Sequence, residues 1–225
     1  MNLPERILFI GAHCDDIELF AGGLLARACF AHKQIGVLVF SDHRGVLDEA
    51  AAARAHGEFL DNMNWLRCES KADIRDHSGQ MLPACQGAFQ SERGKLYAAM
   101  ESLRSEYDLV VTHIASDTNQ DHQQVAQEAA RVFKAHCTLL GGEFANNDLG
   151  GFTPRVYFAL SQREVAAKER LVGNYHSQNF GGRPYLDGGV VQALARLRGS
   201  QIREHAAEAF DVAGRIVLRA RGDQR

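Results

Sequence analysis

Residues 8–23 read LFIGAHCDDIELFAGG and place a histidine and two adjacent aspartates directly after a run of apolar residues. The run RILFIGAH (6–13) predicts a strand buried on both faces of a sheet, because such a strand needs apolar side chains throughout. Apolar residues with helical spacing follow over 16–33, and Asp15 and Asp16 lie where the start of a helix favours negative charge. We therefore expect a strand that leads directly into a helix, with polar side chains at the junction.

The rest of the chain alternates between predicted strands and predicted helices. Strands are expected at 6–13, 34–41, 64–68, 108–114, 154–161 and 214–221, and helices at 16–33, 47–63, 91–107, 121–136 and 163–176. Such alternation is typical of right-handed βαβ units and a mostly parallel sheet. Since 225 residues suit one domain with a sizeable core, we predict a single α/β domain over residues 1–225 with a doubly wound, Rossmann-like sheet. Residues 70–90 and the glycine-rich 179–189 are predicted to be loops, and the second either covers a substrate or only connects elements.

Composition and charge exclude several classes of partner. The chain has 25 basic and 28 acidic residues, a net charge of −3, which favours neither a nucleic-acid nor a membrane-surface partner. No apolar stretch approaches the roughly 20 residues of a membrane span. Five cysteines without a C-x-x-C spacing indicate a reducing compartment, so we expect a cytoplasmic protein. A homo-oligomer is left open.

Two polar clusters follow predicted strands, at 13–18 and at 113–122. In open α/β sheets, sites form at the carboxyl ends of the strands. Two histidines and one carboxylate can hold zinc and leave a fourth position for water, and we propose His13, Asp16 and His122 as the ligands. Water bound to zinc has a pKa near neutrality. Asp15 would then accept a proton from this water and pass it to a leaving amine.

Other interpretations of these residues remain. The stretch 13–16 can be a metal-free turn that caps a helix, and Asp121-His122 can be a helix start. Asp117, Asn119, Asp121 and Glu128 fit positions 1, 3, 5 and 12 of a calcium loop, although His122 stands where that loop needs glycine.

Two further groups of polar residues, after the second predicted strand and in the helix that follows it, fit either the surface of the protein or the site. Ser41, Asp42 and His43 follow that strand, and we expect a surface turn there, with the rim of the crevice as the alternative. Arg54 and Glu58 are spaced for an i,i+4 ion pair on a solvated helix face.

At these motifs the sequence resembles the LmbE-like, or PIG-L-type, zinc-dependent N-deacetylases, which include N-acetylglucosaminyl-inositol deacetylases. The family motif A-H-P-D-D-E corresponds to residues 12–18, and the motif H-x-D-H corresponds to residues 119–122. Weaker matches are Gly22-Gly23, the pair Arg54 and Glu58, the set Tyr175, Ser177 and Gln178, and AAEAF at 206–210.

The resemblance implies a hydrolase that uses Zn²⁺ to remove an N-acetyl or other N-acyl group from a sugar or sugar conjugate. By this resemblance His13, Asp16 and His122 are the zinc ligands and Asp15 is the general base. It further implies that Asp121 supports the catalytic centre as a partner of a histidine or of the metal site. Arg54 and Asn119 are the corresponding candidates for contact with the substrate.

The sequence departs from the family pattern at three places. Cys14 replaces proline beside the metal ligands, and the family glutamate is either shifted to Glu18 or replaced by Ile17. Asn119 replaces a histidine that often stabilises the oxyanion or protonates the leaving group, and His113 and His205 are the alternatives for that work. The rival functions are an amide hydrolase with a non-sugar or antibiotic-precursor substrate, and a metal- or nucleotide-binding module of the same fold without turnover.

Overall fold

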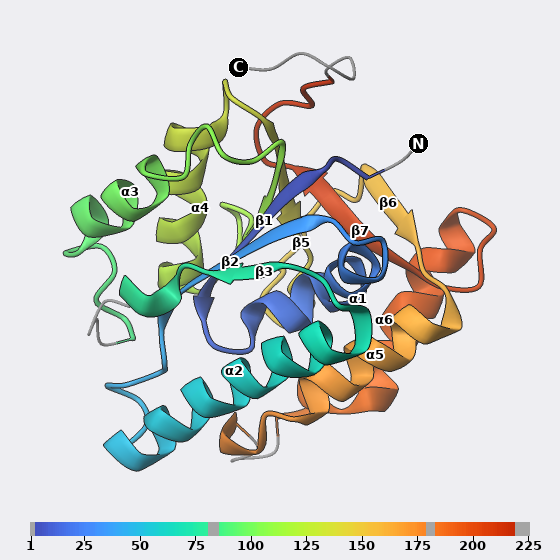
Figure 1. The fold of residues 1–225 in the computed structure, drawn as a ribbon, viewed down its shortest axis with the longest axis horizontal. Coiled ribbons are helices and arrows are strands. Elements are labelled where there is room, and N and C mark those ends of the chain that lie inside the picture. The colour runs from blue at the N-terminus through green and yellow to red at the C-terminus, as the bar shows by residue number, and fades with distance from the viewer. Residues whose placement is uncertain (1–2, 81–85, 179–182, 219–225) are drawn as a thin grey trace.

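A single seven-stranded sheet with the order β3-β2-β1-β4-β5-β7-β6 runs through the computed structural model, which describes residues 3–80, 86–178 and 183–218 (Figure 1). The strands are β1 (Arg6–His13), β2 (Gln34–Ser41), β3 (Ile74–Asp76), β4 (Leu109–Thr112), β5 (Thr138–Gly142), β6 (Val156–Ala159) and β7 (Ala207–Val212). The α-helices are α1 (Asp16–Phe30), α2 (Glu49–Ser70), α3 (Arg93–Glu101), α4 (Gln120–Phe133), α5 (Gln162–Gly173) and α6 (Gly188–Gln201).

The sheet has a switch in strand order next to its first strand. β1 pairs in parallel with β2 on one side and with β4 on the other. The pairs β2–β3 and β4–β5 are also parallel, whereas β7 runs antiparallel to both β5 and β6. The predicted doubly wound, mostly parallel sheet is therefore confirmed. In such sheets, ligands bind outside the carboxyl ends of the strands at the switch, here β1 and β4.

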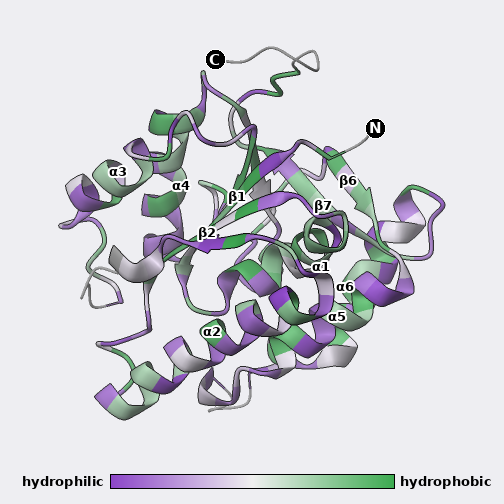
Figure 2. Ribbon diagram, viewed as in Figure 1, coloured by the Kyte–Doolittle hydropathy of each residue, from purple (hydrophilic) through white to green (hydrophobic). Residues whose placement is uncertain are grey.

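Helices cover both faces of the sheet and create two apolar cores (Figure 1). Successive side chains of β1 point to opposite faces, so Ile7 and Phe9 pack with α1, α2 and α5, while Leu8 and Ile10 pack with α3 and α4. The hydrophobic colour of β1 in Figure 2 reflects this burial on both sides. The two-sided core holds the ends of β1 and β4 in fixed positions.

The predicted strand at 64–68 is wrong, because α2 continues through it to Ser70. Met63 and Leu66 point into the core from this helix. Short apolar runs do not distinguish a strand from a buried helical turn. The third strand is instead β3, inside the predicted loop 70–90, of which residues 81–85 lie outside the described part of the chain.

The predicted strand at 214–221 is also wrong over its described part, since residues 214–218 form no strand and 219–221 lie outside the described residues. The C-terminal strand of the sheet is β7. It was not predicted, because Glu208 and Asp211 interrupt the apolar pattern of this segment. The short strand β5 was not predicted either.

The glycine-rich stretch 179–189 holds the start of a helix that was not predicted. Asp187 caps α6, with its side chain accepting a hydrogen bond from the amide of Gly189. The rest of the predicted loop includes residues 179–182, which lie outside the described part of the chain.

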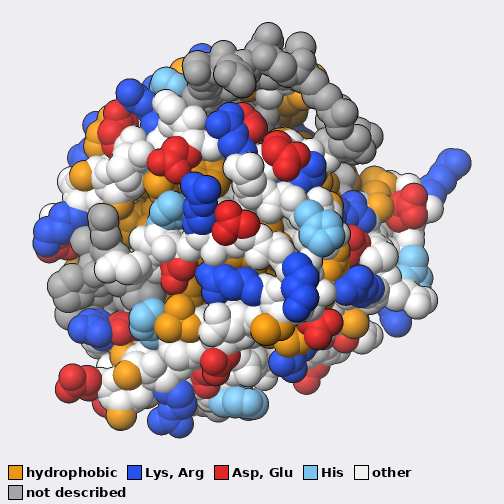
Figure 3. All heavy atoms as spheres, viewed as in Figure 1, with side chains coloured by type: hydrophobic (Ala, Val, Ile, Leu, Met, Phe, Trp, Pro, Cys, Tyr) orange, Lys and Arg blue, Asp and Glu red, His pale blue; other side chains and the backbone are white. Residues whose placement is uncertain are grey.

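Acidic and basic side chains are interspersed over the face of the molecule drawn in Figure 3. This mixture matches the near balance of 25 basic and 28 acidic residues in the sequence. Within the described residues, none of the helices combines the length and apolar character that crossing a membrane requires.

Helix α1 is broken at Ala21, where the backbone leaves helical geometry (φ −142°, ψ 19°). The carboxylate of Glu208 on β7 accepts hydrogen bonds from the amides of Gly23 and Leu24, at 2.8 and 2.7 Å. Lys168 pairs with the same carboxylate at 2.7 Å. Glu208 therefore caps the second half of α1, which explains why the glycine pair and the motif near the C-terminus occur together.

Substituting Gly23 with alanine should destabilise this junction. An added Cβ would lie 2.5 Å from Leu160 Cδ1 and 3.1 Å from the carboxyl carbon of Glu208. We expect Gly23→Ala to lower the free energy of unfolding by about 1–3 kcal/mol, the usual effect of overpacking, as measured by urea denaturation. Gly57→Ala is the matched control, because beyond its chain neighbours and the backbone of its own helix no described atom lies within 4 Å of its added Cβ, and we expect it to be neutral or stabilising by up to about 1 kcal/mol. A Gly23→Ala protein as stable as the wild type would contradict this packing.

Candidate metal centre

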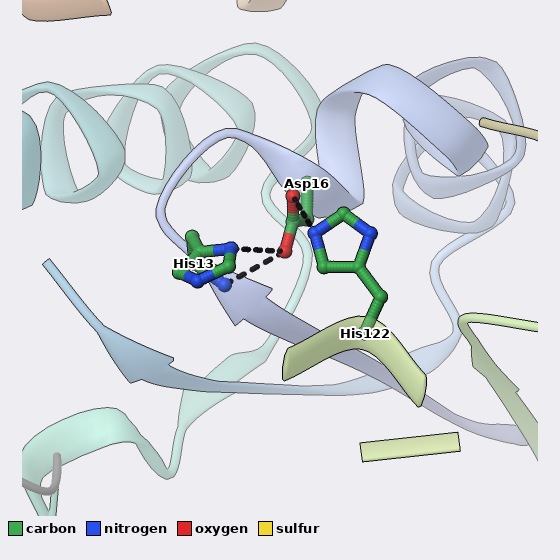
Figure 4. Close-up of side chains that lie close together, drawn as sticks. All are labelled: His13, Asp16 and His122. Carbon is green, nitrogen blue, oxygen red and sulfur yellow. Dashed lines mark hydrogen bonds and ion pairs between the residues drawn. The ribbon is translucent and has the colours of Figure 1, made fainter. Parts of the chain in front are cut away.

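The three predicted metal ligands meet at the carboxyl ends of β1 and β4 (Figure 4). His13 is the last residue of β1, Asp16 is the first residue of α1, and His122 lies in the first turn of α4. Nδ1 of His13 is 3.4 Å from Oδ2 of Asp16, and Nε2 of His122 is 3.3 Å from Oδ1 of the same carboxylate. Each residue is 2 % exposed. Two imidazoles and one carboxylate from distant parts of the chain thus face one another in a buried site.

A second carboxylate orients each imidazole. Nε2 of His13 lies 3.1 Å from Asp121, and Nδ1 of His122 lies 2.8 Å from Asp117. A carboxylate accepts a hydrogen bond only from a protonated ring nitrogen, so in each neutral ring the opposite nitrogen is free of hydrogen and faces Asp16. Histidines that bind metals are held in this way by carboxylates behind them. The donor set and its orientation therefore fit a divalent cation such as zinc.

The segment before α4 is organised by its own polar side chains. The amide oxygen of Asn119 accepts hydrogen bonds from the amides of Asp121 and His122, at 2.9 and 3.4 Å, and caps the helix. Asp117 accepts a hydrogen bond from the amide of Asn119 at 2.8 Å. Asn119, which replaces the family histidine, thus sets the position of His122 and keeps its amide nitrogen for other contacts.

The calcium-loop interpretation is wrong, because its carboxylates point in different directions. Asp117 faces His122, and Asp121 faces His13 while also accepting a hydrogen bond from the amide of Gly87. Glu128, farther along α4, pairs with Arg131 at 2.9 Å. These carboxylates do not converge on one ion.

A second group of potential ligands, His113, Asp117 and His122, has less suitable geometry. The rings of His113 and His122 stack at 3.9 Å with an angle of 19° between their planes. Their in-plane lone pairs therefore lie in two nearly parallel, separate planes, which disfavours convergence on one ion. In addition, Nε2 of His113 accepts a hydrogen bond from the amide of Ala12 at 3.0 Å. Nε2 of His113 also lies 3.1 Å from Oδ2 of Asp16. Because this nitrogen accepts from Ala12, we do not assign His113 as a ligand or as the missing proton donor.

The charges of the site favour a cation. Burial alone would raise the pKa of Asp16, but His122, His113 and His13 around it hold that pKa well below its usual value. Burial likewise opposes a charge on His122, yet Asp16 and Asp117 raise its pKa to about 10. Burial and the neighbouring His122 lower the pKa of His113 to about 4. Carboxylates that stabilise a proton on His122 would also stabilise a metal cation at the same nitrogen.

Asp15, the predicted base, lies beside the ligands in an unusual backbone conformation. Its φ of 109° is rare for a residue with a side chain and costs on the order of 1–3 kcal/mol. Its side chain does not cap α1. Oδ1 of Asp15 lies 3.4 Å from Nε2 of His43, so the carboxylate faces the end of β2.

His43 is buried at the site, which corrects the expected surface turn. It is 5 % exposed, and its ring stacks on that of His13 at 5.0 Å. Burial disfavours a charged imidazole, but Asp15 and the carbonyl of Cys14 raise the pKa of His43 to about 9. The sequence signal was its place at the carboxyl end of a strand that neighbours β1, and sequence alone does not separate this place from a solvated turn.

Arg54, a candidate for substrate contact, is exposed on α2. The i,i+4 pair with Glu58 is not formed, because Glu58 accepts hydrogen bonds from the amide and hydroxyl of Ser177, at 3.1 and 2.5 Å. Among the described residues no ion pair or hydrogen bond holds the Arg54 side chain, which leaves its guanidinium free.

The shifted glutamate of the first motif, Glu18, is completely buried between helices. It accepts hydrogen bonds from Tyr175 at 2.7 Å and from Asn62 at 3.1 Å. Burial raises its pKa to about 7. Together with the contact between Glu58 and Ser177, this network explains the motif at 175–178 as a connection between α1, α2 and the turn after α5.

Cys14 lies beside the metal ligands, as the sequence predicts, but its thiol does not face them. Cys14 packs completely buried in the core, and burial raises the pKa of its thiol well above the ordinary value. His205 is exposed between α6 and β7. The histidine beside Asp15 is His43 instead.

Fold and site together define a doubly wound α/β protein with a buried His–Asp–His cluster at the switch in strand order. Residues 8–133 match the PIG-L family, described as GlcNAc-PI de-N-acetylase. This match covers more than half of the chain, and the protein belongs to the PIG-L family.

Other proteins support this placement. A curated relative, the uncharacterized deacetylase YaiS of Escherichia coli (strain K12), is 28% identical in an alignment of 178 residues, which covers 74% of this chain and 88% of YaiS. The conserved protein TT1542 from Thermus thermophilus has a similar structure, with a TM-score of 0.72, 21% identity and coverage of 99% of this chain and 100% of TT1542. The N,N'-diacetylchitobiose deacetylase from Pyrococcus horikoshii aligns with a TM-score of 0.71 and 15% identity, over 92% of this chain and 83% of that enzyme. At these identities the two structures show the shared fold.

Proposed function

We propose that this protein is a zinc-dependent N-deacetylase that hydrolyses the N-acetyl group of an amino sugar or sugar conjugate. The observation that carries the proposal is the convergence of His13 and His122 on Asp16, with Asp15 directly beside them. Membership of the PIG-L family and the deacetylase name of YaiS support it. The sugar substrate is inferred from the family description and from the chitobiose deacetylase of the same fold.

In this proposal His13, Asp16 and His122 hold the Zn²⁺. A zinc ion in such a site polarises the acyl carbonyl and lowers the pKa of water to about 7. Asp117 and Asp121 would accept hydrogen bonds from the outer ring nitrogens of His122 and His13, so that the inner nitrogens point at the ion. The chain thereby supplies a preformed site whose geometry does not depend on the substrate.

Asp15 carries the proton in the proposed reaction. Its carboxylate accepts a proton from the attacking water, whose oxygen forms the new bond to the acyl carbon. The C–N bond then breaks, and Asp15 returns the proton to the leaving nitrogen, so the products are acetate and a free amine. Burial of Asp15, which is 3 % exposed, keeps bulk water from competing for that proton.

The proposal also covers the substrate contacts, the domain and its location. Arg54 and Asn119 are proposed to contact the sugar. Within the described part of the chain, neither the Arg54 guanidinium nor the Asn119 amide nitrogen has a hydrogen-bond partner. We also propose that residues 1–225 act as a single LmbE-like deacetylase domain in the cytoplasm. Zinc as the metal, and the small-molecule N-acylated sugar as the partner, are part of the same proposal.

The test combines metal analysis with an assay for amine release. Purified protein is assayed with N-acetylglucosamine, N,N'-diacetylchitobiose and non-sugar acetamides, with and without a chelator. We expect about one zinc per chain and amine release from a sugar substrate that stops with chelator and returns with zinc. Bound zinc with no amine release from any substrate would favour the binding module, and release from non-sugar amides alone would change the substrate class.

The carboxylates behind the ligands should set the affinity for the metal. We expect Asp117→Asn and Asp121→Asn each to weaken zinc binding by about 10–100-fold, the usual effect of removing such a partner. Asparagine keeps the side-chain shape and removes the charge that orients the imidazole. Competition with a chromophoric chelator measures the affinity, and the exposed Asp61→Asn on α2 is the matched control. Equal zinc affinity in all of these proteins would contradict the assigned orientation.

A further inference from the structure

We propose that His43 is a positioning residue that holds the carboxylate of Asp15 in its working orientation. This inference rests on the proposed function, in which Asp15 moves the proton. Neither the family motifs nor the comparisons assign a role to His43, which follows β2 and lies outside both polar clusters of the sequence.

The contacts of the His43 ring define its orientation. Nε2 lies 2.6 Å from the carbonyl oxygen of Cys14, so this nitrogen carries a hydrogen and donates it. The same nitrogen lies at ion-pair distance, 3.4 Å, from Oδ1 of Asp15. Nδ1, on the other side of the ring, lies 3.3 Å from the side-chain amide of Gln86. With its face stacked on His13, the ring is held from several sides.

Hydrogen bonds also connect the backbone turns that hold Asp15 and His43. His43 has a φ of 67°, so both it and Asp15 lie in the left-handed region. The amide of Cys14 donates to the carbonyl of Ser41 at 3.0 Å, and the amide of His43 donates to the Ser41 hydroxyl at 3.2 Å. The turn after β2 is thereby fixed against the turn after β1, and His43 has a rigid support.

Asp15 depends on this contact. Of the described residues, only His43 has a polar side-chain atom within hydrogen-bond or ion-pair distance of its carboxylate. A carboxylate without that contact can rotate about its side-chain bonds. A misplacement of about 1 Å at a reacting group can lower the rate about 10²-fold, so the orientation of Asp15 matters for turnover more than for binding.

The test compares His43→Asn with His43→Gln. Asparagine tolerates the left-handed conformation but is too short to place a nitrogen where Nε2 lies, whereas the amide nitrogen of glutamine reaches that place. We expect His43→Asn to lower kcat on the best N-acetylated sugar by about 10²-fold with little change in KM or zinc content. His43→Gln should recover most of kcat, and His43→Asn should add little in an Asp15→Asn background.

Crystal structures provide a readout that does not require activity. In His43→Asn the Asp15 carboxylate should leave the orientation that it has in the wild type and in His43→Gln. His32→Asn, an exposed histidine with a φ of 52°, is the matched control for the substitution and should change nothing. An unchanged Asp15 orientation or an unchanged kcat in a folded His43→Asn protein would overturn the inference, as would equal losses in both variants. A wild type that releases no amine would overturn the proposed function instead, and the crystal comparison would still decide the role of His43.

Discussion

Replacing Asp15 by asparagine should lower kcat by about 10²–10⁴-fold, the range that a positioned general base contributes, while zinc remains bound. The carboxamide has the same shape but cannot accept the proton of the attacking water. Asparagine also tolerates a positive φ better than most residues, so the 109° conformation of this position adds little strain. Asp15 is not among the three converging ligands, so the metal site should stay intact.

The measurement requires both kcat and zinc content on the same Asp15→Asn preparation. Asp61→Asn, the same chemical change on the exposed face of α2, should leave both quantities at the wild-type value. Loss of zinc together with activity would show that Asp15 supports the metal instead of moving a proton. An Asp15→Asn enzyme with wild-type kcat would remove Asp15 from the chemistry.

The position of the site could be predicted because it depends on local patterns. An apolar run that ends in His13 indicates a buried strand, and the residues directly after it have the pattern of a helix start. The same holds for the segment that ends β4 and starts α4. Once both strands are parallel and adjacent, as they are here, polar residues at their carboxyl ends have to lie near each other.

The parts that could not be predicted depend on contacts between distant residues. β7 forms a strand by pairing with β5 and β6, while its Glu208 caps α1 and pairs with Lys168, and no local pattern contains these distant contacts. Asp117 fitted a calcium loop by spacing, and only its 2.8 Å contact with His122 assigns it to the histidine.

His43 is the clearest example, since its neighbours in sequence resemble a surface turn. Its burial results from the stacking on His13 and the hydrogen bond to the Cys14 carbonyl, both with residues of the β1 turn. A residue that supports a site from another strand leaves little trace in the sequence, because spacing along the chain does not encode its contacts.

Replacing His122 by asparagine should abolish stoichiometric zinc binding and reduce amine release to background. The substitution removes the nitrogen that lies 3.3 Å from Asp16 and leaves two ligands at the β1 end. It also replaces the ion pair between His122 and the buried Asp117 carboxylate by a hydrogen bond from a neutral amide at most, which should cost about 1–3 kcal/mol of stability in the metal-free state. Zinc analysis after dialysis and urea denaturation of the metal-free proteins measure the two effects separately.

If the result differs, the zinc content and the stability of the metal-free protein together show whether the ligand assignment or the pairing with Asp117 is wrong. His32→Asn, which removes an exposed histidine, should bind zinc as the wild type does. If His122→Asn were destabilised but kept full zinc and activity, the metal would lie elsewhere, and His122 would only pair with Asp117. If residues after β1 alone held the cation, His122→Asn would keep the metal. Loss of the metal in His122→Asn would show that residues after both β1 and β4 are needed to bind it.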